Sequence, residues 1–455
     1  MNAIAALSLL GLLSLLGLSM GERVRCPGRW PIYCDGCQCC PNGCLCPNAH
    51  DCPASTHCPI ADPATCGMGS SLGPTAQPET STQFQTTHVV SSEASTTTGC
   101  VQTTAGPSPG THSTTTAAPG TLILDEEFNT LNFQRWKHEL TMSGGGNWEF
   151  QVYQNNRTNS YVRDGVLYIK PGLTADFVGS EDVMKFRGEL DLWGTSPADL
   201  CTGNAFYGCK RVAGGGGNYL PPITSARLRT AEHFAFRYGR IEIKAKLPLG
   251  DWLWPAIWLL PRDNEYGNWP ASGEIDIVES RGNRGYPQSA GGGPESFGTT
   301  LHFGPNYMQD HWQKAHAVYS LPSGTFADEF HTFGFVWKAD RMYSYVDSEE
   351  NIVMDLPITK SMWDIGDFPS SYANPWATAN GLNAPFDKQF YIILNLAVGG
   401  TGGYFPDGVG GKPWTNNDPH STNTFWNNKA KWINTWDLTG EKSALQVDSI
   451  KVWAI

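Results

Sequence analysis

Three carboxylates that lie close together are the clearest chemical signal in this sequence. Glu274, Asp276 and Glu279 occur within the segment SGEIDIVESRGN, among apolar residues that suit a buried strand. On a regular strand Glu279 would point away from the other two acids, because side chains alternate between the faces. A β-bulge at Ile277 and Val278 would insert one residue and return Glu279 to the face of Glu274 and Asp276. The segment therefore predicts three carboxylates on one face of a bulged strand.

Such a cluster favours a chemical role, because repulsion between carboxylates is costly for stability. Retaining glycoside cleavage uses one ionised carboxylate as nucleophile and a protonated one as acid and then base, about 5–5.5 Å apart. The Cα atoms of Glu274 and Glu279 would be about 13 Å apart on a bulged strand, so strand curvature and long side chains must close the gap. Two other interpretations stay open. One is an exposed acidic strand face, and the other is a calcium site, although the spacing lacks the glycine-turned loop of a standard calcium site.

The elements that would position these acids are strands, as the alternation of apolar and polar residues indicates. From residue 121 onward, short alternating runs are separated by Gly, Pro, Asn and Asp, as in YGRIEIKAKLP. YVRDGVLYIK predicts a hairpin that turns at Asp164 and Gly165. Further strands are predicted in FHTFGFVWKADRMYSYVD, FYIILNLAVGG and LQVDSIKVWAI. We find no helical period, so an antiparallel all-β sandwich or jelly roll over residues 121–455 is expected.

Composition excludes several classes of protein. The 455 residues are 12% aromatic and only 16% charged, with 50 Gly and 31 Pro, which argues against coiled coils, helical bundles and acidic disorder. The 31 basic and 43 acidic side chains give a net charge of -12. This is the wrong sign for a protein that binds a phosphate backbone, so we expect no nucleic-acid partner.

The N-terminal part predicts secretion. Residues 1–21 resemble a signal peptide, with a signal anchor as the alternative, and after cleavage we expect a secreted, extracellular protein without a membrane span. Ten cysteines follow in residues 22–66 and predict a small disulfide-rich module. A zinc knuckle at Cys34 and Cys37 is the competing interpretation. Residues 67–120 are rich in Ser, Thr and Pro and predict an extended linker to the catalytic domain, residues 121–455.

Three cysteines lie outside this module. Cys201 and Cys209 enclose a short loop and are predicted to pair. This leaves Cys100 in the linker, either as a free thiol or as a link between two chains. The module itself could bind wall polysaccharide and hold the catalytic domain near its substrate.

Four stretches carry a family resemblance: PPITSARLRTAEHFAFRYGRIEIKAKLPLGDWLWPAIWLLP, SGEIDIVESRGN, TTLHFGP and YIILNLAVGG. They resemble the laminarinase branch of glycoside hydrolase family 16, and within it the invertebrate β-1,3-glucanases and β-1,3-glucan-binding proteins. The resemblance covers residues 121–455. It implies a concanavalin A-like jelly roll with an open cleft and retaining endo-hydrolysis of β-1,3-glucan, with no cofactor required for catalysis.

The resemblance also implies roles for the acids. Glu274 matches the nucleophile and Glu279 the acid/base, while Asp276 is expected to hydrogen-bond Glu274 and to set the protonation of the pair. Many glucan-recognition relatives lack one or both glutamates. Because all three acids are present here, an active enzyme is favoured over a pattern-recognition protein of innate immunity that binds β-1,3-glucan with little or no hydrolysis.

Other residues are implied by the same resemblance. Trp254 and Trp258 would stack on sugar faces, and His302 would lie by the acid/base and hydrogen-bond Glu279 or the leaving sugar. Asp448 matches a position that helps to hold a structural calcium ion away from the cleft. Asn156, in the sequon NRT, is a candidate for N-glycosylation. The weaker candidates for sugar contacts are Asn147, Trp148, Arg227 and Asn395.

Overall fold

The computed structural model describes residues 23–25, 33–35, 38–40, 43–45, 117–194 and 200–455, in two units, Met1–Ser108 and Pro109–Ile455. In the first unit β1 (Arg23–Arg25) pairs with β2 (Tyr33–Asp35), and β3 (Gln38–Cys40) pairs with β4 (Gly43–Leu45), both antiparallel. The predicted signal peptide, the pairing of the ten cysteines, Cys100 and nearly all of the predicted linker lie outside this description. They remain predictions.

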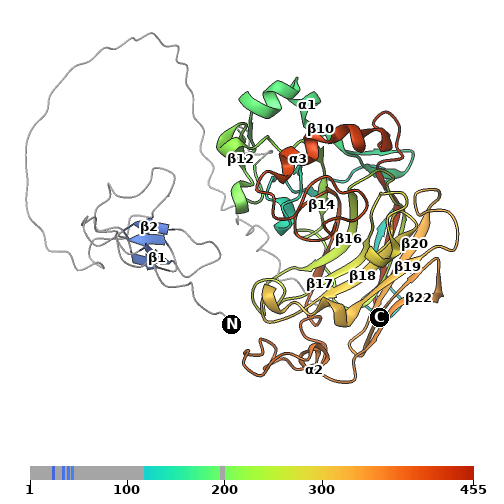
Figure 1. The fold of residues 1–455 in the computed structure, drawn as a ribbon. Coiled ribbons are helices and arrows are strands. Elements are labelled where there is room, and N and C mark those ends of the chain that lie inside the picture. The colour runs from blue at the N-terminus through green and yellow to red at the C-terminus, as the bar shows by residue number, and fades with distance from the viewer. Residues whose placement is uncertain (1–22, 26–32, 36–37, 41–42, 46–116, 195–199) are drawn as a thin grey trace, which may run out of the picture. The chain divides into compact units, whose positions relative to one another are not determined.

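Two large antiparallel sheets form the second unit (Figure 1). The first has seven strands, in the order β19 (His316–Ser320), β18 (Ser296–His302), β17 (Glu274–Glu279), β16 (Leu253–Pro261), β23 (Phe390–Val398), β14 (Arg227–Arg229) and β6 (Lys137–His138). The second has the order β22 (Ser348–Pro357), β21 (Arg341–Val346), β20 (His331–Trp337), β15 (Gly239–Lys246), β24 (Leu445–Trp453), β9 (Val166–Ile169) and β8 (Ser160–Arg163). Its eighth strand, β5 (Leu122–Glu126), pairs with β24.

One hydrophobic core joins the two large sheets. It contains Ile257 and Ile275 of the seven-stranded sheet together with Ile243, Phe333 and Ile450 of the eight-stranded sheet, all fully buried. Burial of apolar faces from both sheets is what holds a β-sandwich together. The predicted all-β jelly-roll class is therefore confirmed.

The sequence patterns that predicted a strand and a hairpin correspond to a strand and a hairpin in the structure. Strand β15 alternates buried with half-buried or exposed residues along almost its whole length, as YGRIEIKAKLP predicts. Strands β8 and β9 form the predicted hairpin, and its turn residues Asp164 and Gly165 have φ of 52° and 76°. Both values belong to the left-handed region that a two-residue hairpin turn requires and that Gly tolerates best.

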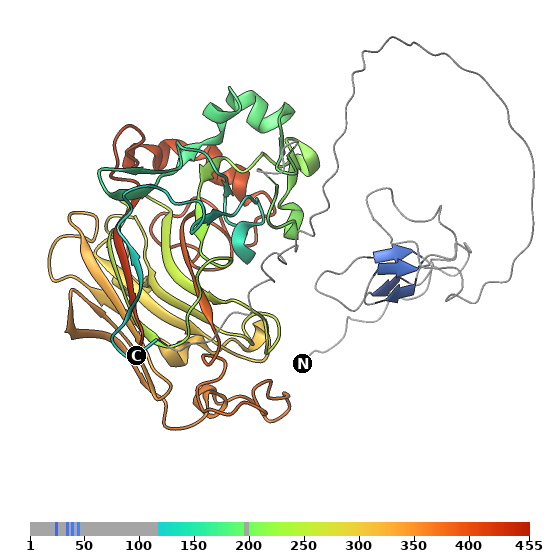
Figure 2. The same ribbon diagram turned by 180° about the vertical axis from the view of Figure 1, so that it is seen from behind.

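Smaller elements surround the sandwich. The strands β10 (Gly172–Leu173), β13 (Ile223–Ser225) and β7 (Gln151–Tyr153) form a three-stranded sheet, and β11 (Glu189–Asp191) pairs with β12 (Lys210–Val212). Short helices α1 (Thr174–Phe177) and α3 (Ser421–Asn427) lie at one end of the unit, and α2 (Met362–Gly366) lies at the other (Figures 1 and 2). Among the described residues, no helix has the length and apolar character needed to cross a membrane.

Candidate active site

Strand β17 carries the bulge that the sequence predicts. Glu279 and Val278 pair with Ala256 and Ile257 of β16, but the next residue of β16, Trp258, pairs with Asp276, so Ile277 is passed over. The pairing with β18 shifts at the same place, between Asp276 and Glu279. Such an extra residue reverses the alternation beyond it, which turns Glu279 to the same side as Glu274 and Asp276.

Two tryptophans hold the two glutamates. The indole nitrogen of Trp269 donates to Glu274 Oε2 at 2.9 Å, and that of Trp254 donates to Glu279 Oε1 at 3.0 Å. Trp269 comes from the loop just before β17, whereas Trp254 lies on the neighbouring strand β16. Trp254 thus lies beside the acids and contacts Glu279 through its polar edge, and its stacking on a sugar face remains a prediction. The sequence analysis did not identify Trp269, which lies five residues before Glu274.

His302 contacts different groups from those expected. It pairs with Glu274 across β17 and β18, and its ring nitrogens lie 3.2 Å from Asp276 Oδ2 and 2.6 Å from Asp310 Oδ2. The expected hydrogen bond from His302 to Glu279 is not formed, because the ring is held between these two aspartates. Asp310 was not predicted, since its contact with His302 depends on the loop after β18.

Asp276 also differs from the expectation. It forms no hydrogen bond with Glu274, and its buried Oδ2 atom accepts no well-aligned hydrogen bond from the described residues. A hydrogen bond between Asp276 and Glu274 requires a proton on one of the two groups, because ionised carboxylates are both acceptors and repel each other. The charge of Asp276 raises the pKa of both Glu274 and Glu279.

The electrostatics of the cluster favour bound protons. Burial and then the charge of Asp276 raise the pKa of Glu279 to about 7, and the same two causes raise the pKa of Glu274 well above its usual value. Burial alone would lower the pKa of His302, but Asp276, Asp310 and Glu274 outweigh burial and raise this pKa to about 12. A cationic imidazole consequently lies among the carboxylates, and Glu279 can hold a proton near neutral pH.

A stacked column supports Trp254. Tyr404 stacks on the Trp254 ring, with centroids 3.9 Å apart and planes within 2° of parallel. The Arg281 guanidinium covers Tyr404, 3.9 Å from its centroid, and donates to the Tyr404 carbonyl oxygen at 2.7 Å. The column Arg281–Tyr404–Trp254 therefore fixes the indole that donates to Glu279. The sequence analysis missed Arg281 and Tyr404, and only the position of Arg281, two residues after Glu279, could have drawn attention to it.

Trp258 and Asn395 belong to a second network on this sheet. Trp258 Nε1 donates to Asn395 Oδ1 at 2.6 Å, and Asn395 Nδ2 donates to the Tyr153 hydroxyl at 3.1 Å. These bonds satisfy the buried amide, whose burial would otherwise be costly. Arg227 lies over the Trp258 ring, 4.6 Å from its centroid, and pairs with Glu139 at 3.0 Å. The predicted sugar contacts Trp258, Asn395 and Arg227 are thus brought together.

The remaining two candidates lie beyond this network. The Asn147 carbonyl oxygen accepts hydrogen bonds from the amides of Thr401 and Gly402, and the Trp148 side chain is 47% exposed. Glu149, which the sequence analysis missed, accepts hydrogen bonds from Gln151 at 2.7 Å and from the Tyr153 hydroxyl at 3.3 Å. Glu149 therefore extends the polar network from Tyr153, and Asn147 and Trp148 directly precede it in the chain.

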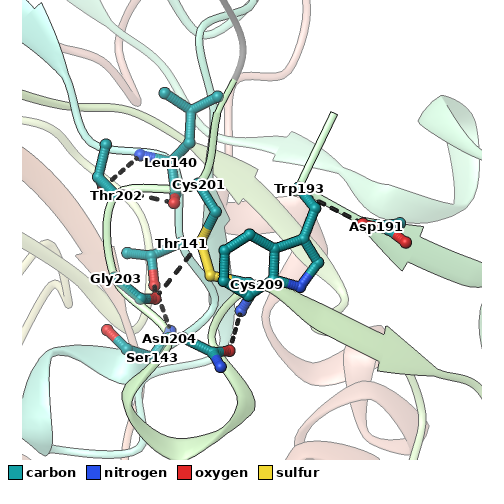
Figure 3. Close-up of a disulfide and its surroundings, with 10 residues drawn as sticks. All are labelled: Leu140, Thr141, Ser143, Asp191, Trp193, Cys201, Thr202, Gly203, Asn204 and Cys209. Atoms are coloured by element: carbon teal, nitrogen blue, oxygen red, sulfur yellow. Dashed lines mark hydrogen bonds between the residues drawn. A yellow bond between two sulfur atoms is a disulfide. The ribbon is translucent and has the colours of Figure 1, made fainter. Parts of the chain in front are cut away.

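The predicted disulfide between Cys201 and Cys209 is present (Figure 3). Asn156 lies half-buried before a turn, where its side-chain oxygen accepts a hydrogen bond from the Thr158 amide at 2.9 Å, and its glycosylation remains a prediction. Asp448 pairs with Lys244 at 3.2 Å. An ammonium group beside this carboxylate lends no support to the predicted calcium site, because calcium requires several oxygen ligands.

One group of described residues has ligand atoms close enough together to bind a metal ion. Single ligand atoms of Glu274, Asp276 and His302 lie within 4.8 Å of one another. A cationic His302 cannot donate a lone pair, and its two nitrogens already face Asp276 and Asp310. The arrangement fits proton transfer better than metal ligation.

Comparison with known proteins assigns the chain to a family. Residues 203–377 match the model of glycosyl hydrolases family 16. A β-1,3-glucan-binding protein of Penaeus monodon is 51% identical over 337 residues, which is 73% of this chain and 90% of that protein. The chain belongs to glycosyl hydrolase family 16. Hydrolysis in family 16 needs no cofactor, in agreement with a site built from acids and a histidine.

Other relatives within family 16 differ in their described activity. A glucan endo-1,3-β-glucosidase of Cryptopygus antarcticus is 32% identical over 327 residues, covering 70% of this chain and 93% of that protein. The laminarinase of Rhodothermus marinus has a TM-score of 0.44 and 24% identity, over 73% of this chain and 96% of that structure. The relatives by sequence thus include a protein named for glucan binding and one named for glucan hydrolysis.

Proposed function

We propose that residues 121–455 form a retaining endo-1,3-β-glucanase, secreted by means of the signal peptide 1–21 and joined to the Cys-rich module by the linker. The observation that carries this proposal is the bulge in β17, which faces Glu279 toward Glu274 and Asp276. A bulge leaves one residue unpaired in the ladder, so its presence between two catalytic-type acids favours chemistry over stability.

In the proposed reaction ionised Glu274 attacks the anomeric carbon while the glycosidic bond breaks, and the proton of Glu279 passes to the leaving oxygen. The His302 cation and the hydrogen bond from Trp269 favour ionised Glu274, and a proton on Glu279 removes one of the charges that oppose it. Water then attacks the glycosyl–Glu274 ester, gives its proton to Glu279 and releases the second product. Asp276 helps to keep Glu279 protonated through its charge, and the His302 cation offsets part of the negative charge of the cluster.

A glucan-recognition protein of innate immunity is the second candidate. The observation in its favour is the 51% identity with the Penaeus monodon protein, which is described as a β-1,3-glucan-binding protein. In that case the carboxylates would hydrogen-bond sugar hydroxyls without turnover. Calcium at Asp448, a glycan at Asn156 and polysaccharide binding by the Cys-rich module are further proposals that do not distinguish the two candidates.

Product analysis separates the two candidates. We expect the secreted protein to release short β-1,3-oligosaccharides from laminarin, with the β anomer appearing first in proton NMR. Glu274→Gln and Glu279→Gln should each lower kcat by at least about 10³-fold and leave laminarin binding intact, because they remove groups that act in the transition state.

Glu350→Gln is the matched control, because Glu350 is an exposed glutamate on β22 and should tolerate the change. Release of the α anomer first would contradict a retaining mechanism. Tight laminarin binding with no product from the wild type would favour the recognition protein.

A further inference from the structure

Exposed aromatic side chains gather beside the polar network of the candidate site. Trp148, Phe206 and Tyr207 are 47%, 50% and 79% exposed, and Tyr207 has the largest exposed fraction of any large apolar side chain among the described residues. The rings of Trp148 and Phe206 meet with centroids 5.0 Å apart and planes at 54°. We call these three residues the aromatic platform. Exposure of three large rings at one place is unfavourable in water, so it calls for a partner.

The backbone of the platform is strained as well. Trp148, Phe206 and Tyr207 have φ of 53°, 53° and 61°, in the left-handed region that bulky side chains rarely adopt. Such strain persists only where the surrounding structure imposes it, and it is frequent at ligand-binding sites. The conformation therefore points to a function of the outward-facing rings.

Cys201 and Cys209 close the loop that carries Phe206 and Tyr207. Figure 3 shows the disulfide and hydrogen bonds that join this loop to neighbouring residues. The loop is attached to the segment before Trp148 at three points: Leu140 N to Thr202 Oγ1 at 3.0 Å, Thr141 Oγ1 to Gly203 O at 2.6 Å, and Met142 N to Gly208 O at 2.7 Å. The rings are thus held in place before any ligand arrives, which lowers the entropy cost of binding.

The platform continues the row of residues that starts at the acids. Glu279 pairs with Ala256, Ala256 with Asn395, and Asn395 with Arg227, so the row crosses four neighbouring strands and spans about 14 Å. From Asn395 the hydrogen bonds continue through Tyr153 to Glu149, the residue after Trp148. A chain molecule that lies across the acids along this row would reach the platform.

We propose that the aromatic platform binds additional sugar rings of a β-glucan chain, more than one ring away from the bond that is cut. The proposal rests on the proposed function of the acids. The apolar faces of glucosyl rings suit flat aromatic side chains, and the half-buried side-chain amide of Asn147, next to Trp148, suits sugar hydroxyls. The platform would therefore give the protein a preference for long chains over short oligosaccharides.

Phe206→Ala in the full-length secreted protein tests this. Affinity electrophoresis in native gels that contain laminarin should show about 5-fold to 10-fold weaker retention, the loss expected for one aromatic contact. In kinetics, KM for laminarin should rise by a similar factor, and the fall in kcat/KM should be smaller for the shortest oligosaccharide that is cleaved. Phe206→Tyr keeps a flat ring and should retain wild-type affinity.

Phe177→Ala is the matched control, because Phe177 is a phenylalanine of similar exposure, 53%, on α1. Unchanged retention and unchanged KM of Phe206→Ala on laminarin would overturn the platform, while turnover of laminarin by the same variant would leave the proposed function standing. A change in oligomeric state without a change in laminarin affinity would also overturn it, and would assign the rings to self-association. A Cys201→Ser/Cys209→Ser variant that stays folded should lose laminarin affinity to a similar extent.

Discussion

The surroundings of Glu279 shift its pKa in opposite directions. Burial and the charge of Asp276 raise its pKa, whereas His302, the hydrogen bond from Trp254 and Arg281 lower it, and the balance is a pKa of about 7. As a general acid Glu279 must be protonated. Its protonated fraction falls as the pH rises through this pKa, so kcat/KM on laminarin should decline about tenfold per pH unit above pH 7.

We expect Trp254→Phe to shift the pH at which kcat/KM begins to decline. The variant removes a hydrogen bond that stabilises the charged carboxylate, so the pKa of Glu279 rises and the alkaline limb of the pH profile shifts upward by about one unit. Profiles of kcat/KM between pH 5 and pH 10, by reducing-sugar release from laminarin, would show it. A limb that stays in place would mean that Trp254 does not act on this proton.

Tyr404 is a positioning residue in this picture, because it touches Trp254 and not the acids. Tyr404→Leu removes the ring between Trp254 and Arg281, and we expect kcat on laminarin to fall about tenfold as the indole loses its fixed orientation. The pH profile should shift in the same direction as in Trp254→Phe.

Tyr404→Phe is the control for the stacked ring. The buried Tyr404 hydroxyl has no hydrogen-bond partner among the described residues, so its removal should leave activity unchanged and the Tm equal or higher. Loss of activity in Tyr404→Phe equal to that in Tyr404→Leu would contradict the stacking argument.

At the scale of the element, the bulge in β17 decides which way Glu279 faces. Insertion of one alanine between Val278 and Glu279 would move Glu279 one position along the strand and turn it from the side of Glu274 and Asp276 into the core. Turnover should fall by at least about 10³-fold, as in Glu279→Gln. The insertion also places a carboxyl group among apolar side chains and should cost about 1–3 kcal/mol, so the Tm should drop by several degrees.

Ile277→Val separates a loss of stability from a change in the orientation of Glu279. It keeps the bulge and removes one methylene, which costs about 1 kcal/mol, so turnover should stay near the wild-type value while the Tm falls slightly. Circular dichroism and thermal melts would report the fold, and laminarin turnover the orientation of Glu279. Turnover of a folded insertion variant at the wild-type level would refute the argument that the residue count of β17 sets the face of Glu279.

The bulge is also where the sequence was most informative. The spacing of Glu274, Asp276 and Glu279 makes sense for one shared face only if an extra residue is present, and the structure has that residue at Ile277. By contrast, Tyr404 contacts Trp254 across 150 positions of the chain. Neither strand periodicity nor local motifs report such a contact, because the packing of separate elements determines it.

At the scale of the whole molecule, alternation along each strand was sufficient to predict an all-β sandwich, since it reports which face of each strand is buried. It could not predict the order of the strands. The contacts of His302 show the same limit: its pairing with Glu274 follows from adjacent strands, but its ring is turned by Asp310 in the loop after β18.

The strand order has a consequence for biosynthesis. In the seven-stranded sheet β23 lies between β16 and β14, and in the eight-stranded sheet β24 lies between β15 and β9. While residues 390–453 are still inside the ribosome, both sheets lack a central strand and expose unpaired edges on either side of the gap. Translation of the earlier strands therefore produces an intermediate that is open to aggregation, and chaperones that shield strand edges would have to protect it until these residues emerge.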